Sequence, residues 1–155
     1  MPNRRDETSA ELQPPAITGS RQGIEVSAAL IFHHGKLLIA QRHADAHLGG
    51  LWEFPGGKRE AGETSEQCLL REIREELGVE ISVGELFEEV AHAYPEKSVR
   101  LKFFICRLVS GAPQPLGCAA FCWVDKTELS RFDFPAADAR LLEKSSRLIK
   151  WPAVA

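Results

Sequence analysis

Apolar residues run together in short blocks along most of the chain, and the length of these blocks predicts β-strands. The runs at 24–32 (IEVSAALIF) and 36–40 (KLLIA) flank a polar HHG triplet at 33–35, which predicts a hairpin with both histidines exposed in the turn. Further apolar runs that predict strands lie at 51–54, 79–90, 98–109 and 119–124. The strands therefore recur along nearly the whole chain after the N-terminal region.

The apolar spacing becomes helical after residue 63. The segment TSEQ at 64–67 has the form of a capping box, in which Thr64 caps the helix and Gln67 reaches back. Gly78 suits the left-handed conformation that ends a helix. The residues expected to form the buried stripe of this helix are Leu69, Ile73 and Leu77.

A second amphipathic helix is predicted near the end of the chain, over residues 135–149. Asp125 and Glu128, three residues apart, predict a short helix before it. The residues of the second helix expected to face inward are Leu141, Leu142, Leu148 and Ile149. Strands and two main helices in one unit predict an α/β or α+β sandwich.

Composition fits a single folded domain in a chain of 155 residues, 44% of them hydrophobic. We expect a flexible tail at 1–23, because that stretch is polar, contains a Pro-Pro pair and lacks periodicity, and a folded domain at 24–155. The tail has no apolar core of the kind found in a secretory signal, and no run approaches the roughly 20 apolar residues that span a bilayer. We therefore expect a cytoplasmic protein without a membrane partner.

The four cysteines are also consistent with the expected cytoplasmic location. Cys68, Cys106, Cys118 and Cys122 form no C-x-x-C pair and have no histidine at zinc-ligand spacing. They are expected to be buried free thiols in a reducing cytoplasm.

The net charge of −3 lacks the basic footprint of proteins that bind nucleic-acid polymers stably. A substrate with several phosphates would need a cation to approach this chain. Glu72, Glu75 and Glu76 offer a place for one, because residues three and four apart share a helix face. Oxygen ligands alone favour Mg²⁺ or Mn²⁺ over zinc. The alternative is a solvated acidic face paired with Arg71 and Arg74.

The segment 57–79 (GKREAGETSEQCLLREIREELGV) decides between these interpretations. It matches the signature G-x5-E-x7-R-E-U-x-E-E-x-G-U at every fixed position, namely Gly57, Glu63, Arg71, Glu72, Ile73, Glu75, Glu76, Gly78 and Val79. The chain therefore resembles the Nudix hydrolase family, from about Ile24 to Ile149. The resemblance implies a mixed β-sheet sandwiched between helices, with the signature as a loop–helix–loop.

The resemblance also implies a Mg²⁺-dependent enzyme, for which Mn²⁺ is a possible substitute. It assigns the cation to Glu72, Glu76 and the backbone carbonyl of Gly56, with Glu75 close by. Such cations neutralise developing charge and lower the pKa of an attacking water.

Two further signature residues have supporting roles by the same resemblance. Arg71 would orient a carboxylate, and Glu63 would assist through a water or a second cation. The chain departs from the MutT branch of the family at Gly117, where that branch has a glutamate that reaches the metals. Three candidates therefore remain for the group that takes the proton from the attacking water. They are Glu72, Glu63 and a hydroxide on the cation.

The runs 41–47 (QRHADAH) and 51–58 (LWEFPGGK) are similar to the MutT branch. This similarity implies that Arg42, Lys58 and, more weakly, Lys97 meet phosphate or nucleotide. Core packing of Phe54 and a solvated Lys58 remain alternatives. The nucleotide-contacting residues expected outside the base-recognition segment are Arg42, His47, Glu53, Phe54, Pro55, Gly56, Gly57, Lys58 and Lys97.

Asp138 lies in a segment, 132–138 (FDFPAAD), that resembles the base-recognition segment of MutT. MutT has asparagine at that place. An ionised aspartate only accepts hydrogen bonds. It would suit the N4 amine of cytosine or the N1/N2 edge of guanine and repel guanine O6. An ordinary residue in the first turn of a helix is the other interpretation of Asp138.

The resemblance implies a nucleoside triphosphate pyrophosphohydrolase that releases a nucleoside monophosphate and pyrophosphate. The expected substrate is 8-oxo-dGTP, whose removal protects DNA replication, with CTP or 5-methyl-dCTP as the alternative. A hydrolase of ADP-ribose or related diphosphates and a noncatalytic nucleotide-recognition module are weaker alternatives. The expected partners are small-molecule nucleotides, and the protein is expected to be a monomer or a homodimer.

Overall fold

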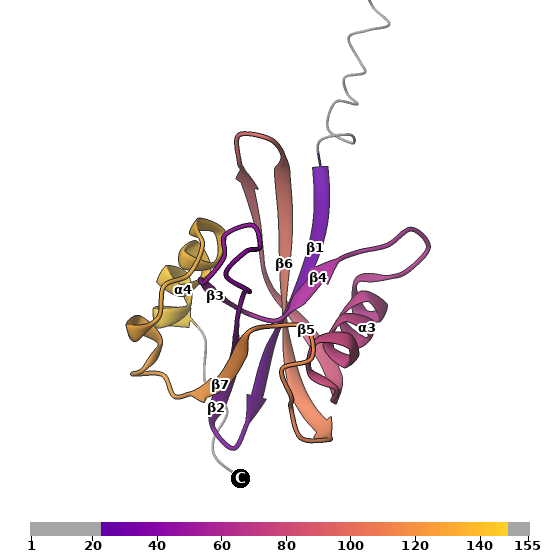
Figure 1. Ribbon diagram of the computed structural model, residues 1–155, viewed down its shortest axis with the longest axis vertical. Coiled ribbons are helices and arrows are strands. Elements are labelled where there is room, and N and C mark those ends of the chain that lie inside the picture. The colour runs from indigo at the N-terminus through magenta and orange to yellow at the C-terminus, as the bar shows by residue number, and fades with distance from the viewer. Residues whose placement is uncertain (1–22, 149–155) are drawn as a thin grey trace, which may run out of the picture.

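The computed structural model describes the chain over residues 23–148, and the side chains over residues 23–143. A mixed sheet lies between two helices that cover its opposite faces (Figure 1). This arrangement confirms the predicted α+β sandwich. The predicted tail, apart from Gly23, and the predicted inward-facing Ile149 lie outside the described residues, as does the side chain of Leu148.

The sheet has seven strands. Their bounds are β1 (Gly23–His33), β2 (Lys36–Gln41), β3 (Trp52–Glu53), β4 (Gly56–Lys58), β5 (Glu80–Ala93), β6 (Ser98–Ser110) and β7 (Ala120–Val124). The main path runs in the order β3-β2-β1-β6-β5, while β4 pairs with β1 and β7 pairs with β2. The β1–β6 pair is parallel and the other pairs are antiparallel, so the sheet is mixed.

The strand β1 holds the sheet together. Its register with β6 runs from Gly23↔Ser98 to Phe32↔Arg107, while its other edge is shared by β2 and β4. The predicted hairpin between β1 and β2 is confirmed, with positive φ angles of 51° at His34 and 77° at Gly35 in the turn. Because the two faces of the sheet are both covered, residues 27–32 of β1 are buried on alternating sides.

The helix α3 (Ser65–Leu77) begins and ends as its sequence predicts. The Thr64 hydroxyl accepts from the backbone N–H of Gln67 at 3.0 Å, and the Gln67 side chain accepts from the backbone N–H of Thr64 at 2.8 Å. Gly78 ends the helix with a φ of 69°. The predicted stripe is fully buried against one face of the sheet, with Leu69, Ile73 and Leu77 at 0% exposure.

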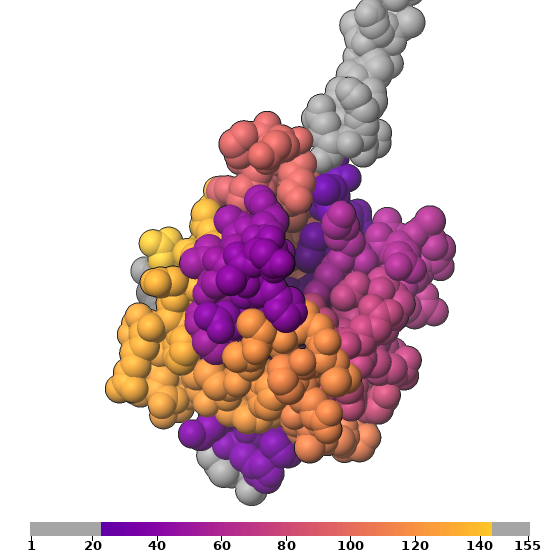
Figure 2. All heavy atoms as spheres, viewed as in Figure 1, coloured from indigo at the N-terminus to yellow at the C-terminus, as the bar shows by residue number. Residues whose placement is uncertain are grey.

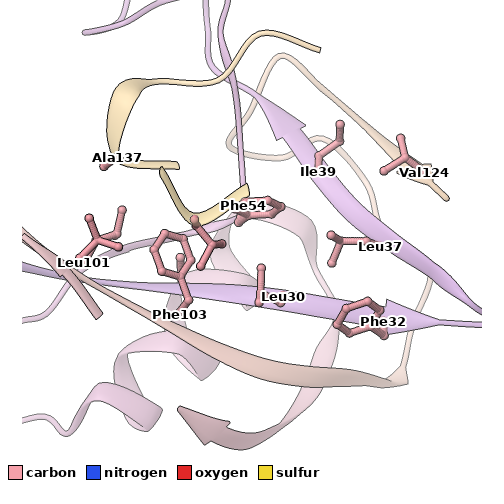
Figure 3. Close-up of a cluster of buried hydrophobic side chains, with 12 residues drawn as sticks. Leu30, Phe32, Leu37, Ile39, Phe54, Leu101, Phe103, Val124 and Ala137 are labelled. Atoms are coloured by element: carbon pink, nitrogen blue, oxygen red, sulfur yellow. The ribbon is translucent and has the colours of Figure 1, made fainter. Parts of the chain in front are cut away.

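The helix α4 (Ala136–Leu148) covers the opposite face. Leu141 is fully buried there and Leu142 is partly buried, as predicted. Figure 3 shows this core, in which the ring of Phe54 lies between the sheet residues and the start of α4. Phe54 stacks on Phe134 with ring centroids 5.3 Å apart and meets Phe103 edge-on at 6.1 Å.

Two local features differ from the prediction. Residues 56–58, expected in a turn and loop, form the short strand β4, because they pair antiparallel with residues 26–28 of β1. The short helix expected after Asp125 is a single 3-10 turn, η1 (Leu129–Arg131). Asp125 does accept from the backbone N–H groups of Thr127 and Glu128, but one turn before that helix begins.

Cys68, Cys106 and Cys118 are buried free thiols, as expected, and Cys122 is partly buried. Burial raises the pKa of Cys68 to about 11 and that of Cys106 to about 12. Among the described helices, none combines the length and apolar character needed to cross a bilayer.

Candidate active site

A cavity of about 620 Å³ opens beside β1. Figure 2 shows a hollow between the loop 43–50 and the segment that follows β4, with β1 at its floor. The tip of the β5–β6 hairpin and the start of α4 complete its walls. The predicted site residues that line it are Arg42, His47, Glu53, Phe54, Gly56, Gly57, Lys58, Glu72, Glu76, Lys97 and Asp138.

Four predicted residues do not line this cavity. Pro55 is buried beside it and turns its carbonyl to β1. Glu63 and Arg71 lie behind Glu72, and Glu75 points outward with 61% of its side chain exposed.

The cavity also has lining residues that sequence reasoning missed. Tyr94 is one, and its position three residues before Lys97 in the same turn was a usable signal. Ser27 is another, a buried polar residue on β1 that the apolar run around it concealed. Pro135, just before α4, also lines the cavity, and its signal was its place in the segment 132–138, which resembles the base-recognition segment of MutT.

Glu72 and Glu76 reach the cavity because of helix geometry. At 3.6 residues per turn, residues four apart are offset by only about 40°, whereas Glu75 and Glu76 differ by about 100°. Gly57 provides the space on the opposite side, since a Cβ atom at that position would overlap the Glu72 carboxylate. Within the described side chains, no three acidic, histidine or cysteine groups lie close enough together to hold a metal ion. Of the three signature glutamates, Glu72 and Glu76 line the cavity and Glu75 does not.

Glu76 is the most unusual acid of the site. Its Oε1 atom is buried and has no hydrogen-bond partner among the described residues. Burial, and then repulsion from Glu53 and Glu72, raises its pKa to about 8. A buried oxygen without a partner is costly unless a cation or donor reaches it. The donor set is all oxygen, so these residues fit a hard divalent cation.

Arg71 holds the carboxylates behind the cavity. It donates to both oxygens of Glu63 at 2.7 and 3.1 Å, to Glu72 at 3.0 Å and to the Lys58 carbonyl at 3.2 Å. Its contact with Glu75 is longer, at 3.4 Å. The hydrogen bond from Arg71, together with one from the Glu60 backbone, lowers the pKa of Glu63 to about 2. Arg71 therefore contacts both Glu72, which lines the cavity, and Glu63, which does not.

Arg42 and Glu53 form a partly buried ion pair in the wall of the cavity. Arg42 Nη1 lies 2.8 Å from Glu53 Oε1, and Arg42 Nε donates to the His47 carbonyl at 2.6 Å. Burial raises the pKa of Glu53, while Arg42 opposes that shift. The pair fixes the guanidinium at the cavity wall and holds the loop 43–50 beside it.

Asp138 occupies the first turn of α4 and is only 6% exposed. Burial, and then repulsion from Glu53, raises its pKa to about 8, although Arg42 opposes the shift. Near neutral pH the neutral form of Asp138 is therefore favoured, whereas the sequence prediction considered its ionised form. The physical reason is desolvation, which the sequence does not show.

Aromatic rings form one rim of the cavity. Tyr94 meets His47 with ring centroids 5.9 Å apart and His92 at 4.5 Å, both edge-on. His92 Nδ1 lies 2.7 Å from Arg140 Nη2, which joins this rim to α4. The rim therefore connects the loop 43–50, the end of β5 and α4.

Gly117 lies against the end of α3, where its backbone N–H donates to the Glu76 carbonyl at 3.0 Å. A Cβ atom there would lie 3.3 Å from the Glu76 Cα, so the loop passes close to the helix. No acidic side chain is present between 111 and 124, and the loop adds none to the cavity.

Comparison with known proteins gives a consistent result. A family model described as NUDIX domain matches residues 27–144. The chain is 43% identical to an 8-oxo-dGTP diphosphatase of Proteus vulgaris over 86 residues, which cover 55% of this chain and 77% of the relative. It is 39% identical to the CTP pyrophosphohydrolase of Escherichia coli K12, over 77% of this chain and 89% of that one. A crystal structure of a MutT protein from Methanosarcina mazei Go1 superposes with a TM-score of 0.73 at 26% identity, over 81% of this chain and 94% of that one.

Proposed function

Because the chain belongs to the Nudix family, we propose that it is a Mg²⁺-dependent pyrophosphohydrolase of the MutT type. It converts a nucleoside triphosphate to a nucleoside monophosphate and pyrophosphate. The observation that carries the proposal is one cavity that brings Glu72 and Glu76 together with Arg42, Lys58 and Lys97. Two carboxylates beside several cations suit a polyphosphate that arrives with a divalent ion.

The proposed cation ligands are Glu72 and Glu76, with the carbonyl of Gly56 beside them. Mg²⁺ commonly binds through one or two carboxylates and completes its shell with waters and substrate phosphates, so two facing glutamates are sufficient. When bound, the cation supplies neutralisation of phosphate charge and activation of water. Glu75, whose side chain points outward, supports the site through Arg71.

The remaining residues position and screen the substrate. Lys58 and Lys97 meet phosphate oxygens, while Arg42, fixed by Glu53, faces the nucleotide. Arg71 holds Glu72 in one orientation. Glu63 is a poor base, because the ion pair with Arg71 keeps its pKa near 2. Glu72 is the better proton acceptor, since burial raises its pKa and it faces the cavity.

The proposed substrates follow the relatives. An 8-oxo-dGTP diphosphatase and a CTP pyrophosphohydrolase both resemble this chain over most of the domain. We take 8-oxo-dGTP as the main candidate and CTP or 5-methyl-dCTP as the second. The activity would protect DNA replication by cleaning the nucleotide pool of the cytoplasm.

A nucleotide panel tests the proposal. The full chain is incubated with Mg²⁺ and 8-oxo-dGTP, dGTP, CTP, 5-methyl-dCTP or ADP-ribose, and the products are separated by chromatography. Release of pyrophosphate from at least one triphosphate supports the proposal. Cleavage of ADP-ribose alone would identify a diphosphate hydrolase, and absence of every product would point to a noncatalytic recognition module.

A further inference from the structure

Arg140 on α4 fastens the end of β5 to that helix. Its Nη1 atom donates to the Ala91 carbonyl at 2.9 Å, and its Nη2 atom lies 2.7 Å from His92 Nδ1. One guanidinium group therefore holds two successive residues of β5. Arg140 and His92 both lie behind the lining of the cavity rather than in it.

The contact between Arg140 and His92 determines the state of the histidine ring. A guanidinium group only donates hydrogen bonds, so His92 Nδ1 has to accept in this contact. The ring is therefore neutral and carries its proton on Nε2. The planar guanidinium serves the carbonyl and the ring from two of its nitrogens, a geometry that the ammonium group of a lysine does not reproduce.

Tyr94 connects this contact to the cavity, which it lines. The His92 ring meets the Tyr94 ring edge-on, with centroids 4.5 Å apart. The backbone of Tyr94 also exchanges two hydrogen bonds with Lys97, at 2.7 and 3.2 Å, which close the tip of the β5–β6 hairpin. The position of Tyr94 therefore determines that of Lys97, which lines the cavity as well.

The same rim reaches the loop 43–50 at its other end. Tyr94 meets the His47 ring edge-on at 5.9 Å, and Arg42 donates to the His47 carbonyl at 2.6 Å. Edge-on ring contacts are weaker and less directional than charge-assisted hydrogen bonds. The placement of the rings therefore depends on the hydrogen bonds at the two ends, from Arg42 at one and from Arg140 at the other.

We propose that Arg140 and His92 are positioning residues that hold Tyr94 and Lys97 in place for the nucleotide. The inference rests on the proposed function, because it takes the ligand of this cavity to be a nucleotide. Arg140 touches no substrate and acts through His92. Its loss weakens binding of the substrate and leaves the chemistry at the carboxylates of α3 nearly unchanged, so KM rises while kcat is retained.

Steady-state kinetics of the full chain tests the proposal, with Mg²⁺ and a triphosphate that the nucleotide panel shows to be hydrolysed. Arg140→Met keeps the aliphatic stem and removes both donors. We expect it to raise KM about fivefold and to change kcat by less than about twofold. Arg140→Lys should not restore the KM of the wild type, because one ammonium group does not replace the two-pronged contact.

A double-mutant cycle tests whether the two residues act through one contact. His92→Phe keeps a ring beside Tyr94 and removes the acceptor, so it should also raise KM. Added to Arg140→Met, it should raise KM by less than about twofold further, because the shared contact is already lost. Arg100→Met provides the control, since Arg100 is an exposed arginine of the same hairpin that donates to Glu89 at 2.9 Å and should leave KM unchanged.

The ring of Tyr94 can be observed directly, because it is the only tyrosine in the sequence. Tyrosine-selective carbon-13 labelling therefore gives ring signals that need no further assignment. In the wild type, nuclear Overhauser effects should join this ring to the rings of His92 and His47. Arg140→Met should weaken both, and Arg100→Met should preserve them.

Three results would overturn the inference. They are a KM for Arg140→Met equal to that of Arg100→Met, a fall in kcat as large as the rise in KM, and ring contacts of Tyr94 that Arg140→Met leaves intact. If any of these occurs while triphosphates are hydrolysed, the positioning role fails and the proposed function stands. If no triphosphate is hydrolysed, the proposed function fails, and the NMR spectra still decide whether Arg140 orients Tyr94.

Discussion

Individual side chains of the signature have unequal positions although they are neighbours in sequence. Glu72 and Glu76 face the cavity, whereas Glu75 points to solvent and reaches Arg71 only at 3.4 Å. The sequence predicts that all three lie on one helix, but their division depends on which side of α3 packs on the sheet. That side is determined by Leu69, Ile73 and Leu77, so the buried stripe controls which glutamates reach the cavity.

Glu75 and Glu76, one exposed and one facing the cavity, provide a matched pair of variants. Glu76→Gln removes the buried charge that would meet a cation, and we expect kcat to fall by at least about 100-fold. Glu75→Gln has the same chemistry at an exposed position, and we expect a loss of less than about tenfold, because it acts only through Arg71. Steady-state rates with saturating Mg²⁺ measure both. Equal losses would contradict the division between the two residues.

Glu76 also makes the metal-free protein sensitive to pH. Its pKa is about 8 in the folded state against an ordinary value of 4.5, so the folded state prefers the neutral form. Stability is therefore lost as pH rises from about 4.5 to about 8, the window between the unfolded and folded pKa values. Glu76→Gln should remove much of this loss and stabilise the protein at pH 8 by several kcal/mol, at about 1.4 kcal/mol for each pH unit between the two pKa values. Urea unfolding in EDTA, at about pH 5 and about pH 8, measures the difference.

Helices and strands were predicted best where contacts between residues close in sequence determine their ends. The capping box at 64–67 and the left-handed Gly78 define α3 with contacts between near neighbours in sequence. The strand β4 was missed because its pairing with Val26–Ala28 lies about thirty residues away in sequence. The sequence also predicted a helix beginning after Asp125, whereas the structure has only the 3-10 turn η1. The start of η1 depends on contacts distant in sequence, because Leu129 packs against the core.

The N-terminal cap of α3 predicts how much the helix contributes to the free energy of unfolding when its capping residue is changed. Thr64→Ala removes the acceptor for the Gln67 N–H and should lower the free energy of unfolding by about 1 kcal/mol. Ser65→Ala, one residue later, makes no such contact in the described structure and should change stability by less than about 0.5 kcal/mol. Urea denaturation of both variants provides the comparison. A larger loss from Ser65→Ala would show that the helix begins elsewhere.

At the scale of the whole molecule, the site joins segments that are far apart in sequence. Arg42 follows β2, Glu76 lies on α3, Lys97 lies in the β5–β6 turn and Asp138 lies in the first turn of α4. The signature and its resemblance predicted most of these residues, because the family fold brings those positions together. They could not predict the burial of Asp138 or the rim formed by Tyr94, because burial depends on how β3, the hairpin tip and α4 approach one another.

A site assembled in this way links ligand binding to global stability. A ligand at 100 times its Kd should stabilise the folded state by about 2.7 kcal/mol. We expect this for a nucleoside triphosphate with Ca²⁺, used as a slowly turning-over substitute for Mg²⁺, and a much smaller effect for the nucleotide in EDTA. Thermal unfolding of wild type and Glu76→Gln measures it, and the variant should lose the cation-dependent part because it lacks the buried carboxylate. Equal stabilisation with and without the cation would mean that the phosphates bind through Arg42, Lys58 and Lys97 alone.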